Sequence, residues 1–204
     1  ETDVLIVGGG IAGCLAGIKA VEAGVSCTIL EKSNTKRSGN AGAGIDHLFS
    51  YIPPLHEKTG YTIEEMKVDQ NKMEFCDQGL GFPELNDFFV EHSYERILEL
   101  EKYGLKFRFP DSKIPGGFRV VSQFHSVPTS LNFEGKDLKR VLTQEAEKAG
   151  VRIYNRVFVT ELLKDGDAVC GAVAIGTREN VIYVVKAKTT ILATAGGVDR
   201  LCRS

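Results

Sequence analysis

The chain has 204 residues, 43% of them hydrophobic, with 25 Lys and Arg against 27 Asp and Glu. This composition fits a folded domain, and the formal net charge of −2 excludes the broad cationic field that nucleic acid or an anionic membrane surface would attract. No apolar run reaches bilayer length, and the five cysteines are scattered without a CxxC pair. We therefore expect a cytoplasmic protein with no direct membrane insertion, no nucleic-acid partner and no metal site of its own.

The first thirty residues predict the start of a parallel βαβ unit. Val4–Val7 is a short apolar run that predicts a strand, and apolar residues recur at helical spacing over Ile11–Val21. A second strand is predicted over Ser26–Leu30, with Glu31 at its carboxyl end. Ligands of such sheets bind at the carboxyl ends of the strands, so we expect a site beside the turn at Gly8 and beside Glu31.

The parallel pattern is then interrupted, and we expect an insertion over about residues 45–134 within a single domain. Before it, Lys32–Gly44 is rich in Gly, Ser and Asn and predicts an extended loop. Thr62 opens a capping box and therefore a helix. A second helix is predicted from Pro83 to Gly104, and a short strand around Phe118–Val121.

The pattern resumes with a helix over Lys136–Ala149 and a strand over Val151–Tyr154. Four further strands are predicted at Phe158–Leu163, Ala172–Ile175, Val181–Val185 and Thr190–Thr194. We expect the first three to pair antiparallel. The predicted fold class is therefore α/β, a Rossmann-like domain with a parallel sheet and crossover helices, plus a small antiparallel β-meander and a helical insertion.

Gly8, Gly10 and Gly13 form the spacing GxGxxG between the first strand and the first helix. Gly8 permits the tight turn, Gly10 removes a side chain where a pyrophosphate would approach the backbone, and Gly13 allows the helix to pack on the strand. The N–H groups of Ile11 and Ala12 would face the pyrophosphate. This context indicates a dinucleotide-binding turn.

Glu31 is placed to accept hydrogen bonds from both hydroxyls of an adenosine ribose, and its charge disfavours NADP. These features fit NAD and FAD equally, because both carry an ADP moiety. The small-residue loop from Lys32 to Gly44 suits a longer cofactor and favours FAD. An NAD-dependent dehydrogenase domain remains the alternative.

The motifs resemble the flavoprotein superfamily of fumarate reductase, succinate dehydrogenase and L-aspartate oxidase. The resemblance rests on Val4–Gly24, on Glu31, on the Arg37-Ser38-Gly39 segment followed by Gly42 and Gly44, and on the closing Lys186–Gly197. Loop and helix patterns resemble the alpha chain of adenylylsulfate reductase in particular. The resemblance implies a flavin-dependent oxidoreductase that exchanges electrons with a small anionic substrate and with an iron–sulfur subunit.

The resemblance also implies where FAD is held. Gly39 stands where several members carry the histidine that attaches the flavin, so noncovalent FAD is expected. The implied cofactor residues are Gly8, Gly10, Ile11, Ala12, Gly13, Glu31, Lys32, Arg37, Ser38, Gly39, Asn40, Gly42, Gly44, Phe158, Val159, Ala193, Thr194 and Gly196. Members of the superfamily are much longer, so the chain corresponds to an N-terminal part without the capping domain. A nucleotide-binding module without turnover is therefore a second alternative.

Three side chains are catalytic candidates: His47, Arg119 and His125. His47 follows the small-residue loop and would orient an anionic substrate or move a proton, although a plain loop histidine is the other interpretation. Arg119 and His125 would bind a carboxylate, sulfite or phosphate, although Arg119 also fits the edge of a surface strand. His56 is interpreted as a loop residue without a visible partner, and His92 as a core histidine on a helix.

Overall fold

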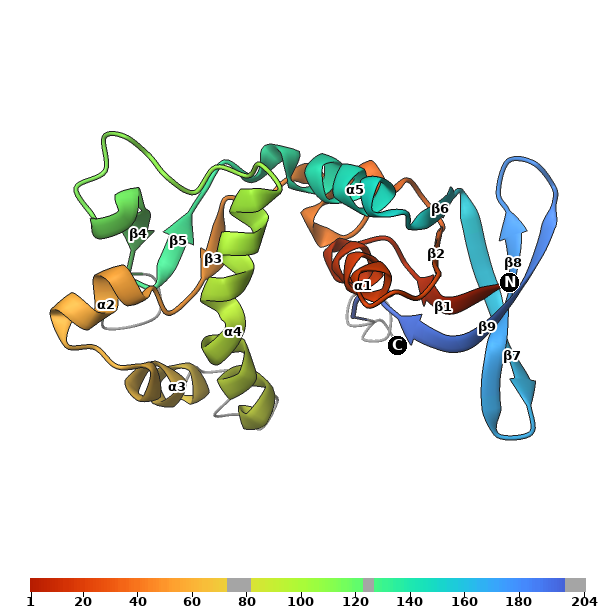
Figure 1. The fold of residues 1–204 in the computed structure, drawn as a ribbon, viewed down its shortest axis with the longest axis horizontal. Helices are drawn as coiled ribbons and strands as arrows, with labels where there is room; N and C mark the ends of the chain where they lie inside the picture. The colour runs from red at the N-terminus through yellow and green to blue at the C-terminus, as the bar shows by residue number, and fades with distance from the viewer. Residues whose placement is uncertain (73–81, 123–126, 197–204) are drawn as a thin grey trace, which may run out of the picture. The chain divides into compact units, whose positions relative to one another are not determined.

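The computed structural model describes residues 1–72, 82–122 and 127–196 (Figure 1). The chain forms two compact units. The first unit comprises Glu1–Gly44 and Asp137–Ser204, and the second unit comprises Ile45–Lys136. Among the described residues, no helix combines the length and the apolar character needed to cross a bilayer.

The first unit is built on a six-stranded sheet with the order β6-β2-β1-β9-β8-β7. Its elements are β1 (Thr2–Val7), α1 (Ile11–Glu22), β2 (Cys27–Glu31), α5 (Leu138–Ala149), β6 (Arg152–Asn155), β7 (Val157–Asp165), β8 (Ala168–Gly176) and β9 (Ile182–Leu192). Strand β1 pairs parallel with β2 and β9, and β2 pairs parallel with β6. Strands β7, β8 and β9 form an antiparallel meander. The predicted α/β class with a parallel sheet and a meander is confirmed.

Strand β9 corrects the prediction of two separate strands at Val181–Val185 and Thr190–Thr194. It runs without a break from Ile182 to Leu192. Its first half pairs antiparallel with β8, and the half that starts at Ala187 pairs parallel with β1. The segment between the predicted strands contains no Gly or Pro, so nothing in it interrupts an extended backbone. One strand therefore joins the meander to the parallel part of the sheet.

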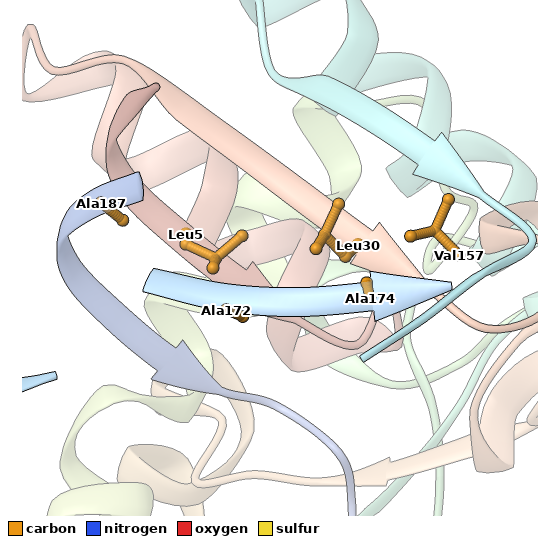
Figure 2. Close-up of a cluster of buried hydrophobic side chains, with 6 residues drawn as sticks. All are labelled: Leu5, Leu30, Val157, Ala172, Ala174 and Ala187. Atoms are coloured by element: carbon orange, nitrogen blue, oxygen red, sulfur yellow. The ribbon is translucent and has the colours of Figure 1, made fainter. Parts of the chain in front are cut away.

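The core of the first unit explains why the apolar runs of β1 and β2 are continuous. Leu5 and Leu30 face the meander and gather with its small side chains in one buried cluster (Figure 2). The other members are Val157, Ala172, Ala174 and Ala187. Ile6 and Ile29 lie toward the opposite face, where they approach Gly13 and Gly17 of α1. Both faces of β1 and β2 are thus covered, as expected for buried parallel strands.

The segment Lys32–Gly44 is more ordered than the predicted extended loop. It contains two short 3₁₀ turns, η1 (Thr35–Arg37) and η2 (Asn40–Ala43). Asn34 caps η1 by accepting a hydrogen bond from the N–H of Lys36. Local side-chain capping of this kind explains why a segment rich in small polar residues forms turns.

The described part of the second unit contains a three-stranded antiparallel sheet of order β3-β5-β4 and three α-helices. Its elements are β3 (His47–Phe49), α2 (Pro53–Thr59), α3 (Ile63–Asn71), α4 (Pro83–Lys102), η4 (Pro115–Gly117), β4 (Arg119–Val121) and β5 (Ser130–Asn132). The capping box of Thr62 with Glu65 is present, and α4 begins at Pro83, as predicted. Helix α2 and strands β3 and β5 are short and were not predicted.

Candidate functional site

The turn between β1 and α1 requires glycine at two of its positions. Gly8 has φ +101°, and a Cβ there would clash with the carbonyl oxygen of Ala193. A Cβ on Gly13 would clash with the carbonyl oxygen of Gly8. The N–H of Gly8 donates to the carbonyl of Leu30 over 2.9 Å. The turn is therefore held tightly against the ends of β2 and β9.

The N-terminus of α1, beside this turn, has no side-chain cap. Its N-cap is Gly10, and its first turn holds no acidic residue. The first N–H groups of an α-helix have no partner within the helix, and here Ala12 is exposed. A Cβ on Gly10 would meet only the Cα of Gly39, at 3.9 Å. Within the described residues these donors have no partner, and together with the missing side chain of Gly10 they form a cradle suited to a pyrophosphate.

Glu31 lies at the carboxyl end of β2 and is only 4% exposed. Its Oε2 accepts the N–H of Gly9 over 2.7 Å, and its Oε1 accepts the N–H of Ser33 over 2.6 Å. A carboxylate offers about four acceptor positions, so each oxygen retains one lone pair for a further donor. The carboxylate is thus oriented beside the turn by two backbone groups.

The carbonyl of Gly9 accepts three side-chain donors, of which the thiol of Cys14 is the most distant, at 3.5 Å. The hydroxyl of Ser38 donates to it over 3.0 Å, and the ammonium of Lys139 donates to it over 2.7 Å. The same ammonium lies 3.2 Å from Sγ of Cys14, and burial raises the pKa of that thiol against the opposing effect of Lys139. Four side chains therefore fix the peptide of Gly9, because Glu31 holds its N–H and the other three donate to its carbonyl.

The loop after β2 lies beside the junction of β6 and β7. Thr35 donates its backbone N–H to Oδ1 of Asn155 over 2.7 Å, and Arg156 donates its N–H to the carbonyl of Ser33 over 2.9 Å. Just beyond this junction, Phe158 is 48% exposed, whereas Val159 packs against the core. Phe158 and Val159, two of the predicted cofactor residues, thus belong to the same part of the unit as Glu31.

The remaining predicted cofactor residues also belong to the first unit. Lys32, Arg37 and Asn40 are exposed. Gly42 packs its backbone on Arg37, where a Cβ would clash with the carbonyl oxygen, and Gly44 has φ +96°. Glycine is therefore required at position 42 because the backbone of the loop packs there on Arg37. The sequence pattern did not indicate this contact.

The end of β9 completes this region. Ala193 donates its N–H to the carbonyl of Val7 over 2.8 Å and lies against Gly8. Thr194 and Gly196 follow and are exposed. All eighteen predicted cofactor residues therefore belong to one unit, although they come from three separate stretches of the chain.

Two catalytic candidates belong to the second unit, and His125 lies outside the described residues. His47 on β3 and Arg119 on β4 both pair with Asn132 of the central strand. His47 is hydrogen-bonded to Asp46, a contact that lowers the pKa of that carboxyl. Both side chains are thus brought into one row of the sheet.

Arg119 is engaged at the surface. It bonds both carboxylate oxygens of Asp111, over 2.8 and 2.9 Å, and its guanidinium lies 3.9 Å from the ring centre of Phe109. This arrangement fits the interpretation of a residue at the edge of a surface strand. Binding of an anion by Arg119 would require Asp111 to be displaced.

The interpretations of two other histidines were wrong. His56 is fully buried in α2, where Nδ1 accepts the N–H of Ile52 over 2.9 Å and Nε2 lies 2.8 Å from the carbonyl of Pro128. The side chain of His92 is 44% exposed and lies against the ring of Phe88. His56 has partners that are distant in sequence, and the face of α4 that carries His92 is partly open to solvent.

Sequence reasoning missed Lys139 and Asn155. Lys139 shares the buried stripe of α5 with Leu142, Thr143 and Ala146. A lysine within an apolar stripe was the available signal, because a buried ammonium requires hydrogen-bond partners. Asn155 gave no comparable signal.

Comparison with known proteins identifies the family. The model of the FAD binding domain family matches residues 3–204, so the chain belongs to that family. It is 26% identical to one chain of the fumarate reductase (CoM/CoB) of Methanothermobacter marburgensis, over 96% of this chain and 35% of that protein. It is 24% identical to the alpha chain of the adenylylsulfate reductase of Megalodesulfovibrio gigas, over 98% of this chain and 32% of that protein.

A solved structure gives the same result. The solved structure of the adenylylsulfate reductase of Archaeoglobus fulgidus superposes with a TM-score of 0.79 and is 33% identical in sequence. The match covers 96% of this chain and 30% of the reductase chain. The chain spans about a third of the length of these relatives. It is therefore an FAD-binding domain, similar to those of fumarate reductase and adenylylsulfate reductase, and its cofactor is FAD.

Proposed function

We propose that this chain is the FAD-binding part of an oxidoreductase that holds FAD without a covalent bond and exchanges electrons with a small anionic substrate. The arrangement that supports this most strongly is the bare start of α1 beside the pinned peptide of Gly9 and the buried Glu31. The start of α1 offers backbone donors for a pyrophosphate, and Glu31, which is bonded to Gly9, offers a carboxylate for the ribose hydroxyls.

Each part of the cofactor has residues that suit it. The N–H groups at Gly10, Ile11 and Ala12 bind the pyrophosphate, while Gly8 and Gly13 hold the turn, and Glu31 accepts the ribose hydroxyls through its remaining lone pairs. The other proposed contacts are Lys32, Arg37, Ser38, Gly39 and Asn40 along the pyrophosphate and ribityl chain, Gly42 and Gly44 beside the flavin ring, Phe158 and Val159 at the adenine, and Ala193, Thr194 and Gly196 over the cofactor. FAD supplies the electron-transfer chemistry when bound.

The residue after Ser38 supports the noncovalent mode. Gly39 has φ +77°, and a Cβ there would lie 3.2 Å from the Cα of Gly10. A side chain at this position is therefore disfavoured by the backbone and by space. The position beside the turn has no group that could form a bond to the flavin.

The substrate class and the electron partner are proposed from the relatives. The similar proteins are named as reductases of fumarate and of adenylylsulfate, which are both anions. We propose a small anionic substrate, with His47, Arg119 and His125 as the candidates to contact it, and an electron partner that is an iron–sulfur subunit. To bind the substrate, His47 would release its hydrogen bond to Asp46, and Arg119 would release its ion pair with Asp111.

The test is the identity of the nucleotide in the purified protein. We expect a yellow protein whose flavin is released by denaturation and identified as FAD by mass spectrometry. We also expect no substrate-dependent turnover by these 204 residues with an artificial electron donor. Flavin that remains on the chain after denaturation would contradict the noncovalent mode, and a colourless protein that binds NAD would contradict the proposal as a whole.

A further inference from the structure

Lys139 is a buried cation in the first unit whose contacts are with neutral groups. The residue is 2% exposed, and its ammonium donates to the carbonyl of Gly9 and toward Sγ of Cys14. Within the described residues it forms no ion pair with a carboxylate. Cys14 does not supply the opposite charge, because burial raises its thiol pKa and so favours the neutral form. The buried carboxylate of Glu31 bonds the other side of the Gly9 peptide but does not contact the ammonium. An ammonium buried without a carboxylate in contact is unfavourable, so its retention needs a reason.

The position of Lys139 provides that reason. Gly9 directly precedes the N-cap of α1, and Cys14 lies in the first turns of the same helix. The ammonium therefore sits behind the turn, where its charge adds to the positive end of the helix dipole. The surface that an anion would approach is the other side of the turn, with the open N–H groups of Ile11 and Ala12.

The contacts of Gly9 also fix the orientation of the turn. Its carbonyl points to Lys139 and Ser38, and its N–H points to Glu31. A rotated peptide would bring the carbonyl oxygen, with its partial negative charge, toward the phosphates. Lys139 opposes that rotation through a charge-assisted hydrogen bond, which is stronger than the neutral bond from Ser38.

We propose that Lys139 is a positioning residue for the pyrophosphate of FAD: it holds the Gly9 carbonyl away from the phosphates and supplies their opposite charge from behind the turn. The ammonium is directed to the Gly9 carbonyl and to Cys14, so it acts through that peptide and not by contact with the phosphates. This role of Lys139 rests on the proposed cofactor contacts. It adds to them a residue that lies 130 positions from Gly9 in the sequence. It concerns the charged part of the cofactor and not its adenosine.

The test compares ADP with adenosine, which lacks the pyrophosphate. Lys139→Met removes the charge and the donor but keeps the length of the side chain, and Ser38 still satisfies the Gly9 carbonyl. We expect calorimetry to show ADP binding weakened about tenfold and adenosine binding changed less than about twofold. The unliganded variant should melt at the same temperature or higher, because a buried charge has been removed. Lys148→Met, on the exposed part of the same helix, should bind both ligands as the wild type does.

Each outcome separates the two proposals. If Lys139→Met binds ADP as tightly as the wild type, or loses ADP and adenosine equally, the role of Lys139 is refuted while the cofactor site stands. If the wild-type protein does not bind ADP, the proposed function fails and the role of Lys139 fails with it. If Lys139→Met does not fold, the same comparison is made on Lys139→Gln, which keeps a donor for Gly9 and removes the charge.

Discussion

The two units of this chain use buried polar groups differently. In the first unit, Glu31, Ser38 and Lys139 all bond one peptide, that of Gly9, and the adjoining start of α1 keeps its N–H donors open. In the second unit, the buried His56 satisfies both of its ring nitrogens within the fold. Buried polar groups therefore indicate a ligand site only where they leave neighbouring donors unpaired.

Surface charges show the same contrast. In the second unit, Arg119 pairs with Asp111, and Lys67 pairs with both Glu64 and Glu91. In the first unit, Arg37 and Lys32 are exposed close in sequence to the turn. The contrast holds only for these two cations near the turn, because elsewhere the first unit also pairs its charges, as in Lys19–Glu22 and Lys188–Asp3.

The largest expected effect comes from the turn itself. Gly8→Ala should lower the free energy of unfolding by at least about 3 kcal/mol, because it combines a positive φ with a clash against Ala193. Gly24→Ala is the matched control, since Gly24 has φ +83° with open space around it, and should cost about 1 kcal/mol. Urea unfolding measures both. Equal losses in the two variants would show that the packing of the turn on β9 is not what constrains Gly8.

The second effect concerns the buried histidine. Burial lowers the pKa of His56, against the opposing effect of its bond to Pro128. The folded state therefore binds fewer protons than the unfolded state, and stability is lost as the pH falls below about 6.5. His56→Gln should cost about 2 kcal/mol at pH 7.5 and should flatten this pH dependence.

Hydrogen exchange of the α2 amides between pH 7.5 and pH 5.5, corrected for intrinsic rates, measures the effect of His56 locally. Amides of β1 and β2 in the same samples serve as the reference. An unchanged pH slope in the variant would mean that His56 is not the group that titrates.

The smallest effect is expected at the surface of the second unit. Arg119→Met removes an exposed ion pair with Asp111 and a contact with Phe109, and should leave the Tm within about 2 °C of the wild-type value. Asp111→Asn should change the Tm as little. A large decrease in the Tm of either variant would show that this exposed ion pair stabilises the fold, contrary to our expectation.

Local patterns in the sequence predicted the parts of the fold that depend on neighbouring residues. These include the GxGxxG turn, Glu31 at the end of β2, the capping box at Thr62 and the start of α4 at Pro83. The continuity of β9 was missed because its pairing changes partners at Ala187, which no local pattern records.

The candidate site was predictable only in part, for the same reason. Gly8 to Gly13 and Glu31 form a motif with fixed spacing, but Lys139 reaches Gly9 across 130 positions, and Asn155 reaches Thr35 across 120. His56 similarly depends on Pro128, 72 positions away. Contacts of this kind become visible only when the sheet and its helices are assembled.

The central claim is that the first unit binds the ADP half of FAD at the turn between β1 and α1. Calorimetric titration of the flavin-free protein with FAD and with FMN, which lacks the adenosine and one phosphate, tests it directly. We expect FAD to bind at least about a hundredfold more tightly than FMN, and ADP to compete with FAD. FMN that binds as tightly as FAD, or ADP that does not compete, would contradict the account.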